Sequence, residues 1–241
     1  MNNASLELGG TNWAEKDASL LGYTVSDDSG RFYPREFTFA RGSNLAATRI
    51  GKTGLIEKGR ENLLLQSNSF NESAWFNINT TETGGQPDKD GGSTAWLIEK
   101  SAANGYIGQQ ISQSGVSTAS VYVKAGTTDW VEVTTDNGGS SYFDLTNGLV
   151  GNNSALIDAQ IESVGSGWYR CIISQLGEVT RARIFPAEAN TKSATSGSIY
   201  IQSAQLEQGL IASPYIETTT TTAQAGVLEN TPRLNYTTGV A

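Results

Sequence analysis

The chain has 241 residues, enough for one large β domain or two small ones. Its formal net charge is −8, so it offers no basic field to gather phosphates, and nucleic acid is a poor partner. The sequence has no histidine and one cysteine, Cys171, which removes common zinc ligands and general bases and excludes an internal disulfide framework.

Residues 1–61 are rich in Gly, Ser, Asn and charged residues and contain only short apolar pieces. We interpret them as an extended N-terminal arm that makes anchoring or oligomer contacts, because Phe32, Tyr33, Phe37 and Phe39 are costly to leave in water. A flexible leader is the alternative. No basic region precedes an apolar run, so we do not expect a signal peptide.

From Asn62 onward the chain alternates between apolar and polar residues, the pattern of half-buried strands. The alternating segments are 94–100, 106–111, 118–124, 130–135, 140–145, 155–164, 168–174, 179–185 and 198–207. Turn signals separate them, for example at 136–139 and 165–167. The pattern predicts an all-β fold, an antiparallel jelly-roll β-sandwich spanning 62–217.

Five consecutive threonines, Thr218–Thr222, follow the last predicted strand and carry no core pattern. We interpret 218–241 as a Thr-rich linker and a C-terminal extension. No stretch of the sequence approaches the ~20 apolar residues of a membrane span, so we expect no membrane insertion.

Side chains alternate between the two faces of a β-strand, and this alternation, which we call strand parity, selects candidate ligand-binding side chains. Val131 and Val133 are expected in the core, which turns their neighbours on the same strand outward. The same parity applied to 118–124 and 140–145 completes the outward set, which is Tyr122, Trp130, Glu132, Tyr142 and Asp144.

If the three strands that carry this set are neighbours, two or three rings share one face with carboxylates between them. Such a face suits a sugar, because a pyranose stacks its apolar side on a ring and hydrogen-bonds its hydroxyls to polar groups. The alternative is that the outward rings cover an oligomer interface or pack under the arm, since aromatic residues are also enriched in protein contacts.

Other conspicuous residues are predicted to be structural. Trp75, Trp96 and Trp168 are expected to pack rather than to bind ligand, and Cys171 is expected to be a small buried hydrophobe. Asp88 and Asp90 lie on a Gly-rich loop and are weak Ca²⁺ candidates, because the full spacing of a calcium loop is absent. A solvated turn is the alternative, and no other cofactor is expected.

Catalysis finds little support in the sequence. Glu132 and Asp144 could serve as a glycosidase pair if held ~5 to 10 Å apart, but no flanking motif selects them among 24 acidic residues. There is no nucleophile elbow, phosphate loop or metal triad. We therefore expect no enzyme.

Four segments in this order resemble a class of tailed-bacteriophage structural proteins whose β-sandwich is similar to carbohydrate-binding modules. They are FTFARGSNLAATRIGKTGLIEKGRENLLLQSNSFNESAW at 37–75, YFDLTNGLVG at 142–151, GSGWYRCIIS at 165–174 and IYIQSAQLEQGLIASPYIET at 199–218. The resemblance implies a virion component, namely a fibre, decoration or tail-associated protein. It also implies contacts with other virion proteins, a homo-oligomer with a trimer expected, and a sandwich suited to host-surface or environmental glycans. The alternative is a non-catalytic carbohydrate-binding module of a polysaccharide-degrading enzyme.

Overall fold

The computed structural model describes residues 13–16, 19–26, 31–37, 49–50, 56–57, 60–135 and 139–225, with side chains described within 61–135 and 139–223. The chain divides into two compact units, Arg60–Ala223 and a second formed by Met1–Gly59 with Gln224–Ala241. The described residues of both units form strands, turns and loops, and none of them builds a helix able to cross a membrane.

The N-terminal segment contains more local structure than the predicted extended arm. Strands β1 (Trp13–Lys16), β2 (Ser19–Ser26) and β3 (Arg31–Phe37) form an antiparallel sheet, and β4 (Arg49–Ile50) pairs with β5 (Ile56–Glu57). The aromatic side chains that suggested anchoring contacts lie outside the described side chains.

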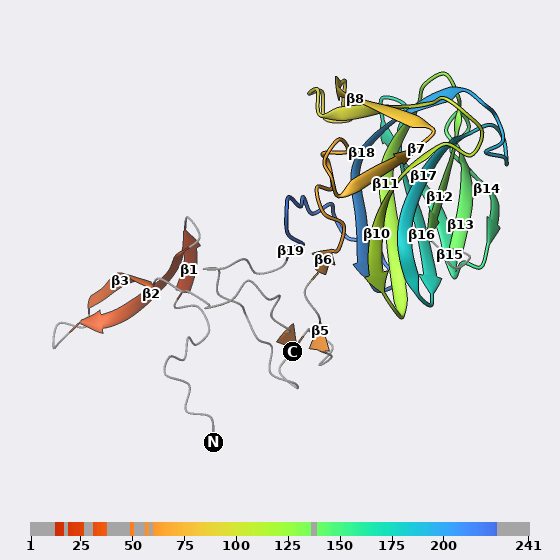
Figure 1. Cartoon of the computed structure of the whole chain (residues 1–241). Coiled ribbons are helices and arrows are strands. Elements are labelled where there is room, and N and C mark those ends of the chain that lie inside the picture. The colour runs from red at the N-terminus through yellow and green to blue at the C-terminus, as the bar shows by residue number, and fades with distance from the viewer. Residues whose placement is uncertain are drawn as a thin grey trace. The chain divides into compact units, whose positions relative to one another are not determined.

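The second unit is an antiparallel β-sandwich of two six-stranded sheets, which confirms the predicted fold class (Figure 1). The front sheet has the order β14 (Leu149–Ser154), β13 (Gly139–Asp144), β12 (Trp130–Thr135), β17 (Val179–Ala187), β10 (Tyr106–Gln113) and β7 (Trp75–Ile78). The back sheet has the order β15 (Asp158–Gly165), β16 (Trp168–Leu176), β11 (Val116–Ala125), β18 (Gly197–Gln208), β9 (Ala95–Lys100) and β8 (Thr80–Gln86). Two short strands, β6 (Arg60–Asn62) and β19 (Ala223–Ala225), lie near the ends of this unit in sequence.

The hydrophobic core lies between the sheets and follows the predicted alternation. Val131 and Val133 from the front sheet meet Val121 and Val123 from the back sheet in one cluster of buried side chains. Trp75 and Cys171 belong to this cluster, Trp96 packs against it, and Trp168 is also buried. The structural roles predicted for these four residues are therefore confirmed.

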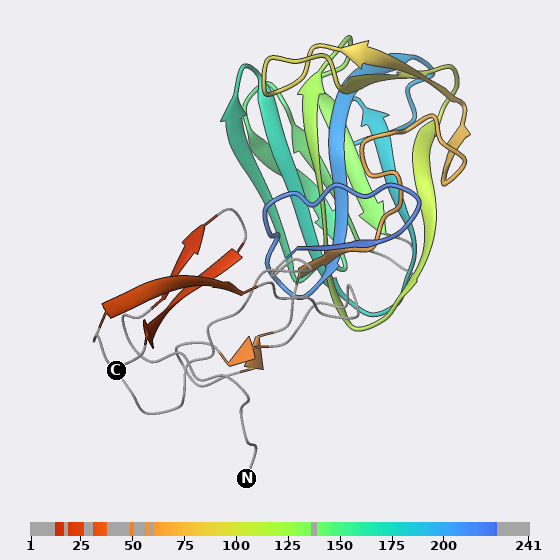
Figure 2. The same cartoon turned by 90° about the vertical axis from the view of Figure 1, so that its left-hand side faces the viewer.

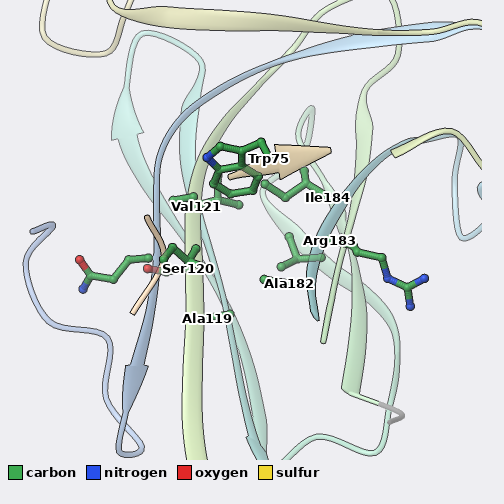
Figure 3. A pocket seen from close by; sticks show the side chains of 11 residues that line it. Trp75, Ala119, Ser120, Val121, Ala182, Arg183 and Ile184 are labelled. Atoms are coloured by element: carbon green, nitrogen blue, oxygen red, sulfur yellow. The ribbon is translucent and has the colours of Figure 1, made fainter. Parts of the chain in front are cut away.

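A small cavity of about 20 Å³ interrupts the core (Figure 3). Trp75, Val121 and Ile184 extend toward it, whereas the guanidinium of Arg183 points away. A space this small and apolar is a packing gap between the sheets, because even one ordered water needs several polar partners.

A segment that follows β18, residues 209–218, covers part of the outer face of the back sheet, and we call it the strap. Figure 2 shows this blue segment crossing in front of the strands. Ser213 fixes its middle, since its N–H donates to the buried carboxylate of Glu207 at 2.8 Å and its carbonyl accepts from the buried guanidinium of Arg170 at 2.6 Å. The peptide units around Ser213 thus connect two buried charges of opposite sign.

Asn62 ties the beginning of the sandwich to its end. Its Nδ2 donates to the carbonyls of Ala204, at 3.1 Å, and Ile216, at 2.8 Å. Its Oδ1 accepts from the N–H groups of Leu64 and Leu206, both at 3.1 Å. The side chain is fully buried, so each of these bonds is made without competing water.

We predict that Asn62→Ala lowers the free energy of unfolding by about 3 kcal/mol or more, because it leaves several buried backbone groups without a partner. Urea unfolding followed by circular dichroism measures this. Asn71→Ala, at an exposed position, is the matched control and should change stability by less than about 0.5 kcal/mol. Equal effects of the two variants would contradict the prediction.

Candidate functional site

The register of the front sheet places three outward side chains in one line. Glu132 of β12 lies opposite Tyr142 of β13 on one side and Phe185 of β17 on the other. Val131 and Val133, which flank Glu132 in sequence, are in the core, so Glu132 and its two neighbours face away from it.

Aromatic rings continue this line toward the opposite edge of the sheet. The ring of Phe185 lies 4.7 Å from that of Tyr106 on β10, and Tyr106 lies 5.9 Å from Phe76 on β7. We call Tyr142, Phe185, Tyr106 and Phe76 the aromatic row. The guanidinium of Arg183 lies 5.3 Å from the Tyr106 ring and 5.5 Å from the Phe185 ring, within the range of cation–π attraction.

A lysine from the loop after β17 closes over the middle of the row. The Nζ atom of Lys192 lies 2.8 Å from Oε2 and 3.1 Å from Oε1 of Glu132, and 4.5 Å from the centre of the Phe185 ring. The carbonyl of Lys192 accepts hydrogen bonds from the Asn104 N–H and from Nζ of buried Lys100. The Glu132 carboxylate is only 3% exposed, so it serves as a buried anchor and not as a surface ligand contact.

Tyr142 stays a neutral hydrogen-bond donor in this environment. Burial raises the pKa of its phenol to about 12, and the charge of Glu132 and a hydrogen bond to it act in the same direction. The ring itself is half-buried, so one part of it remains open to a ligand.

Trp130 lies next to Tyr142 at the end of the row. A Cβ atom placed on Gly151 of β14 would lie 2.6 Å from Cζ3 of the Trp130 ring and 3.3 Å from the Cβ of Tyr142. Glycine at this position therefore gives the indole its place beside the phenol. Both rings are half-buried, and we call Trp130 and Tyr142 together the ring platform.

Asp144, another predicted candidate, is used by the turn that follows its strand. Its carboxylate accepts from the Thr146 N–H at 2.9 Å, from the Asn147 N–H at 3.0 Å and from the Asn147 side chain at 2.8 Å. Burial by itself would raise the pKa of Asp144, but these hydrogen bonds outweigh it and the pKa is lowered. The carboxylate therefore caps the turn, which uses both of its oxygens as acceptors.

Tyr122 does not share this face, so the expectation of five candidates on one surface does not hold. It belongs to β11 in the back sheet, where it lies opposite Arg170 and Gln202. The reason is that residues 126–129 carry the chain from one sheet to the other between β11 and β12. The cationic groups of Lys89 and Arg170 lie 4.9 and 5.5 Å from the Tyr122 ring.

Sequence reasoning did not select Tyr106, Phe185 or Lys192. Strand parity could have found the first two, because Tyr106 precedes core residue Ile107 and Phe185 follows core residue Ile184. No sequence signal places Lys192, which reaches the sheet from a loop.

The calcium candidates form a hydrogen-bonded turn. Asp88 accepts from the N–H groups of Asp90, Gly92 and Thr94 and from the Thr94 hydroxyl, at 2.7 to 3.0 Å. The backbone and hydroxyl bonds from Thr94 lower the pKa of Asp88 to about 2. Asp90 pairs with Lys89 at 2.7 Å, and within the described part of the chain no three acidic, Cys or His side chains gather as a metal site would require.

Comparisons with known proteins give distant similarities. No family model matches the chain, and no curated protein matches it. Among solved structures, the CBM22-1 and GH10 modules of Clostridium thermocellum xylanase 10B with xylohexaose share 14% identity, with a TM-score of 0.38 over 66% of this chain and 30% of theirs.

Two further structures match over a similar share of the chain. The enzymatically active domain of bacteriophage CBA120 tailspike protein 4 shares 18% identity, with a TM-score of 0.35 over 62% of this chain and 21% of that one. A putative sugar binding protein from Bacteroides thetaiotaomicron shares 15% identity, with a TM-score of 0.34 over 61% of this chain and 100% of that one. All three TM-scores are below 0.5, so none of these similarities assigns a ligand or a role to this chain.

We predict that Tyr142 ionises near pH 12, well above an unfolded phenol at about 10. Because the folded pKa is the higher one, the stability that neutral Tyr142 contributes is full below pH ~10 and is lost as the pH rises through 12. The tyrosinate absorbance of the wild type and of Tyr142→Phe is followed in parallel pH titrations. The difference between the two curves reports Tyr142 and should have its midpoint near pH 12. A difference curve centred near 10 would contradict the burial of this phenol against Glu132.

We further predict that Lys192→Met destabilises the protein by about 2 kcal/mol, because it leaves the buried Glu132 carboxylate without its cation. The double variant with Glu132→Gln should recover part of this loss in urea unfolding. Lys89→Met removes an ion pair with exposed Asp90 and is the matched control, expected to cost under about 0.5 kcal/mol. Similar costs for the two lysines, or full additivity in the double variant, would contradict the assigned role of Lys192.

Proposed function

We propose that this chain is a bacteriophage virion structural protein, of the fibre, decoration or tail-associated type, whose β-sandwich binds glycans without cleaving them. The observation that carries the glycan part is the ring platform, two half-buried aromatic side chains that both lie against Gly151 on the outer face of a sheet. The virion part is supported by the four sequence segments that resemble phage structural proteins.

The platform has the chemistry that a sugar requires. A pyranose can stack the C–H groups of one side on the indole of Trp130, while the phenol oxygen of Tyr142, whose proton is donated to Glu132, can accept a hydrogen bond from a sugar hydroxyl. Exposed Asn190 brings an amide to the same place, since its Oδ1 accepts from the N–H of Asn152 at 2.6 Å. Ordered rings with few rotatable bonds lose little entropy on binding, which favours recognition of an uncharged ligand that cannot gain affinity from ion pairs.

Binding is favoured over cleavage by the state of the nearby carboxylates. Glycoside hydrolysis needs two carboxyl groups that reach the sugar. Here Glu132 is buried against Lys192, and the Asp144 carboxylate is taken by backbone and side-chain donors of its own turn. Neither is in a position to donate a proton to a sugar on the platform.

The alternative function is a non-catalytic binding module of a polysaccharide-degrading enzyme. It would use the same platform, and it differs in partners, because only a virion protein should be found on phage particles. Antibodies raised against the sandwich, applied to particles in electron microscopy, distinguish the two. Labelling at a fixed place on the particle supports the virion role, and binding of polysaccharide without labelling supports the module.

We predict that Trp130→Ala raises the dissociation constant for a bound polysaccharide at least about tenfold, equivalent to about 1.4 kcal/mol. The measurement is a glycan-array screen of the wild type, followed by titration calorimetry with the glycans that score. Tyr122→Ala is the matched control, because it removes a half-buried ring from the opposite sheet and should leave binding unchanged.

Gly151→Ala gives a second route to the same test, since the added methyl group would collide with Oδ1 of Asn190 and lie 2.6 Å from the Trp130 ring, and would displace both without removing either. The affinity of this variant for the glycan should fall, although its circular dichroism spectrum should show that the protein stays folded. Two results would count against the proposal, namely a wild type that binds no glycan and a loss of binding in Tyr122→Ala that Trp130→Ala does not share.

A further inference from the structure

Exposed aliphatic side chains gather on one side of the sandwich. Eight large hydrophobic side chains are exposed among the described residues, and Ile78 on β7, at 44%, is alone on its edge of the front sheet. The other seven are Leu149 (59%), Val150 (37%), Ile157 (50%), Val164 (41%), Leu176 (70%), Leu210 (56%) and Ile211 (82%). Single exposed hydrophobics are ordinary, but a set gathered on one side marks an interaction surface.

Several of these side chains are linked through the backbone around Ser174. The Ser174 carbonyl accepts from the Ile157 N–H at 2.8 Å, and its hydroxyl donates to the Leu210 carbonyl at 3.2 Å. Leu176 is two residues further along the same strand, and Ile211 follows Leu210. These four lie at one end of β15, while Val164 lies toward its other end.

Two sheet edges lie on this same side among the described strands. β14 is the last strand of the front sheet and β15 is the last strand of the back sheet. They follow one another in the chain, separated by residues 155–157, and they contact each other (Figure 1). We call β14 and β15 the double edge.

The double edge lacks the usual protection against pairing. Its strands read LVGNNS and DAQIESVG, without the Lys or Pro residues that commonly guard an exposed edge. Most of its residues are exposed. The opposite edge of the front sheet differs, because β7 has only four residues, whereas a register irregularity is found in the pairings of β8, β14 and β15 alike.

We propose that the double edge is the contact surface for a second copy of this chain, joined about a two-fold axis so that both sheets continue from one copy into the other. The double edge holds one edge strand from each sheet. A second sandwich can therefore pair with both sheets at once, edge strand to edge strand. The second copy presents the same double edge, because on the opposite side of the sandwich Ile78 is the one large hydrophobic side chain exposed among the described residues, and β8 there is polar.

The apolar area agrees with a stable contact. The exposed fractions of the seven side chains together equal roughly four fully exposed aliphatic side chains, on the order of 400 Å² of apolar surface. A standard interface buries about 800 Å² per partner, and a little over half of that area is apolar. The double edge and its surrounding side chains thus supply about the apolar share that one partner needs.

The charges on β15 are compatible with this pairing. Its two carboxylates are Asp158 and Glu162. In an antiparallel pairing centred on Ile161, Glu162 lies opposite Gln160 of the second copy and Asp158 lies opposite Val164. No like charges then face each other directly, which would otherwise destabilise the pair. Such a contact joins two copies, and the trimer implied by the sequence resemblance would need a different surface.

The test combines sedimentation velocity with amide hydrogen exchange on the full chain. The wild type should self-associate as its concentration rises, and the amides of 149–165 should become protected in parallel. Leu149→Lys with Ile157→Lys, both at exposed positions, should weaken self-association at least about tenfold and abolish that protection. Ile78→Lys, an exposed apolar residue on the opposite edge, is the matched control and should behave like the wild type.

Three results would overturn the proposal. The first is a wild type in which the amides of 149–165 gain no protection from hydrogen exchange as its concentration rises, whether or not it self-associates. The second is unchanged protection in the double lysine variant, which would place the contact elsewhere. The third is an equal effect of Ile78→Lys, which would mean that added charge, and not the double edge, controls association.

Discussion

The ion pair between Lys192 and the buried carboxylate of Glu132 organises the outer face of the front sheet. Without a cation, a carboxylate this deeply buried would be costly, so the loop that carries Lys192 is held against the sheet. Burial of the phenol raises the pKa of Tyr142 and the same carboxylate raises it further, while the same ammonium covers Phe185. One ion pair thereby fixes the position of a loop, and it leaves Trp130 and Tyr142 as the open part of the surface.

The two outer faces of the sandwich differ in what covers them. On the back sheet, the strap covers buried polar groups, and Ser213 connects Arg170 with Glu207. Two hydrogen bonds hold the beginning and the end of the domain together. The Ser67 N–H donates to the Thr218 hydroxyl at 3.1 Å, and the Thr218 N–H donates to the Ser67 hydroxyl at 2.9 Å. Within the described part of the chain, Trp130 and Tyr142 on the front sheet stay half-buried and are not covered by a comparable strap. This asymmetry explains why we assign ligand binding to the front sheet although both sheets carry outward aromatic residues.

The sequence predicted the parts of the structure that depend on local alternation. The antiparallel β-sandwich, the core positions of Val131 and Val133, and the outward direction of Trp130 and Tyr142 all follow from a period of two residues. What local pattern could not supply is which strands are neighbours. Tyr122 has the right parity but lies in the other sheet, because the short connection 126–129 carries the chain from one sheet to the other. Glu132 was selected as a ligand contact, and only the position of Lys192, distant in sequence, shows it to be an anchor.

The most direct test of the account is to map where a sugar binds by amide chemical shifts, using the isotope-labelled chain and hexaoses of xylose, glucose and mannose in turn. The account predicts that one of these sugars shifts signals from β12, β13 and the Gly151 region of β14, with little change in β11 and β16. Shifts confined to the back sheet, or no shift with a polysaccharide that binds by other methods, would contradict the assignment of the ring platform.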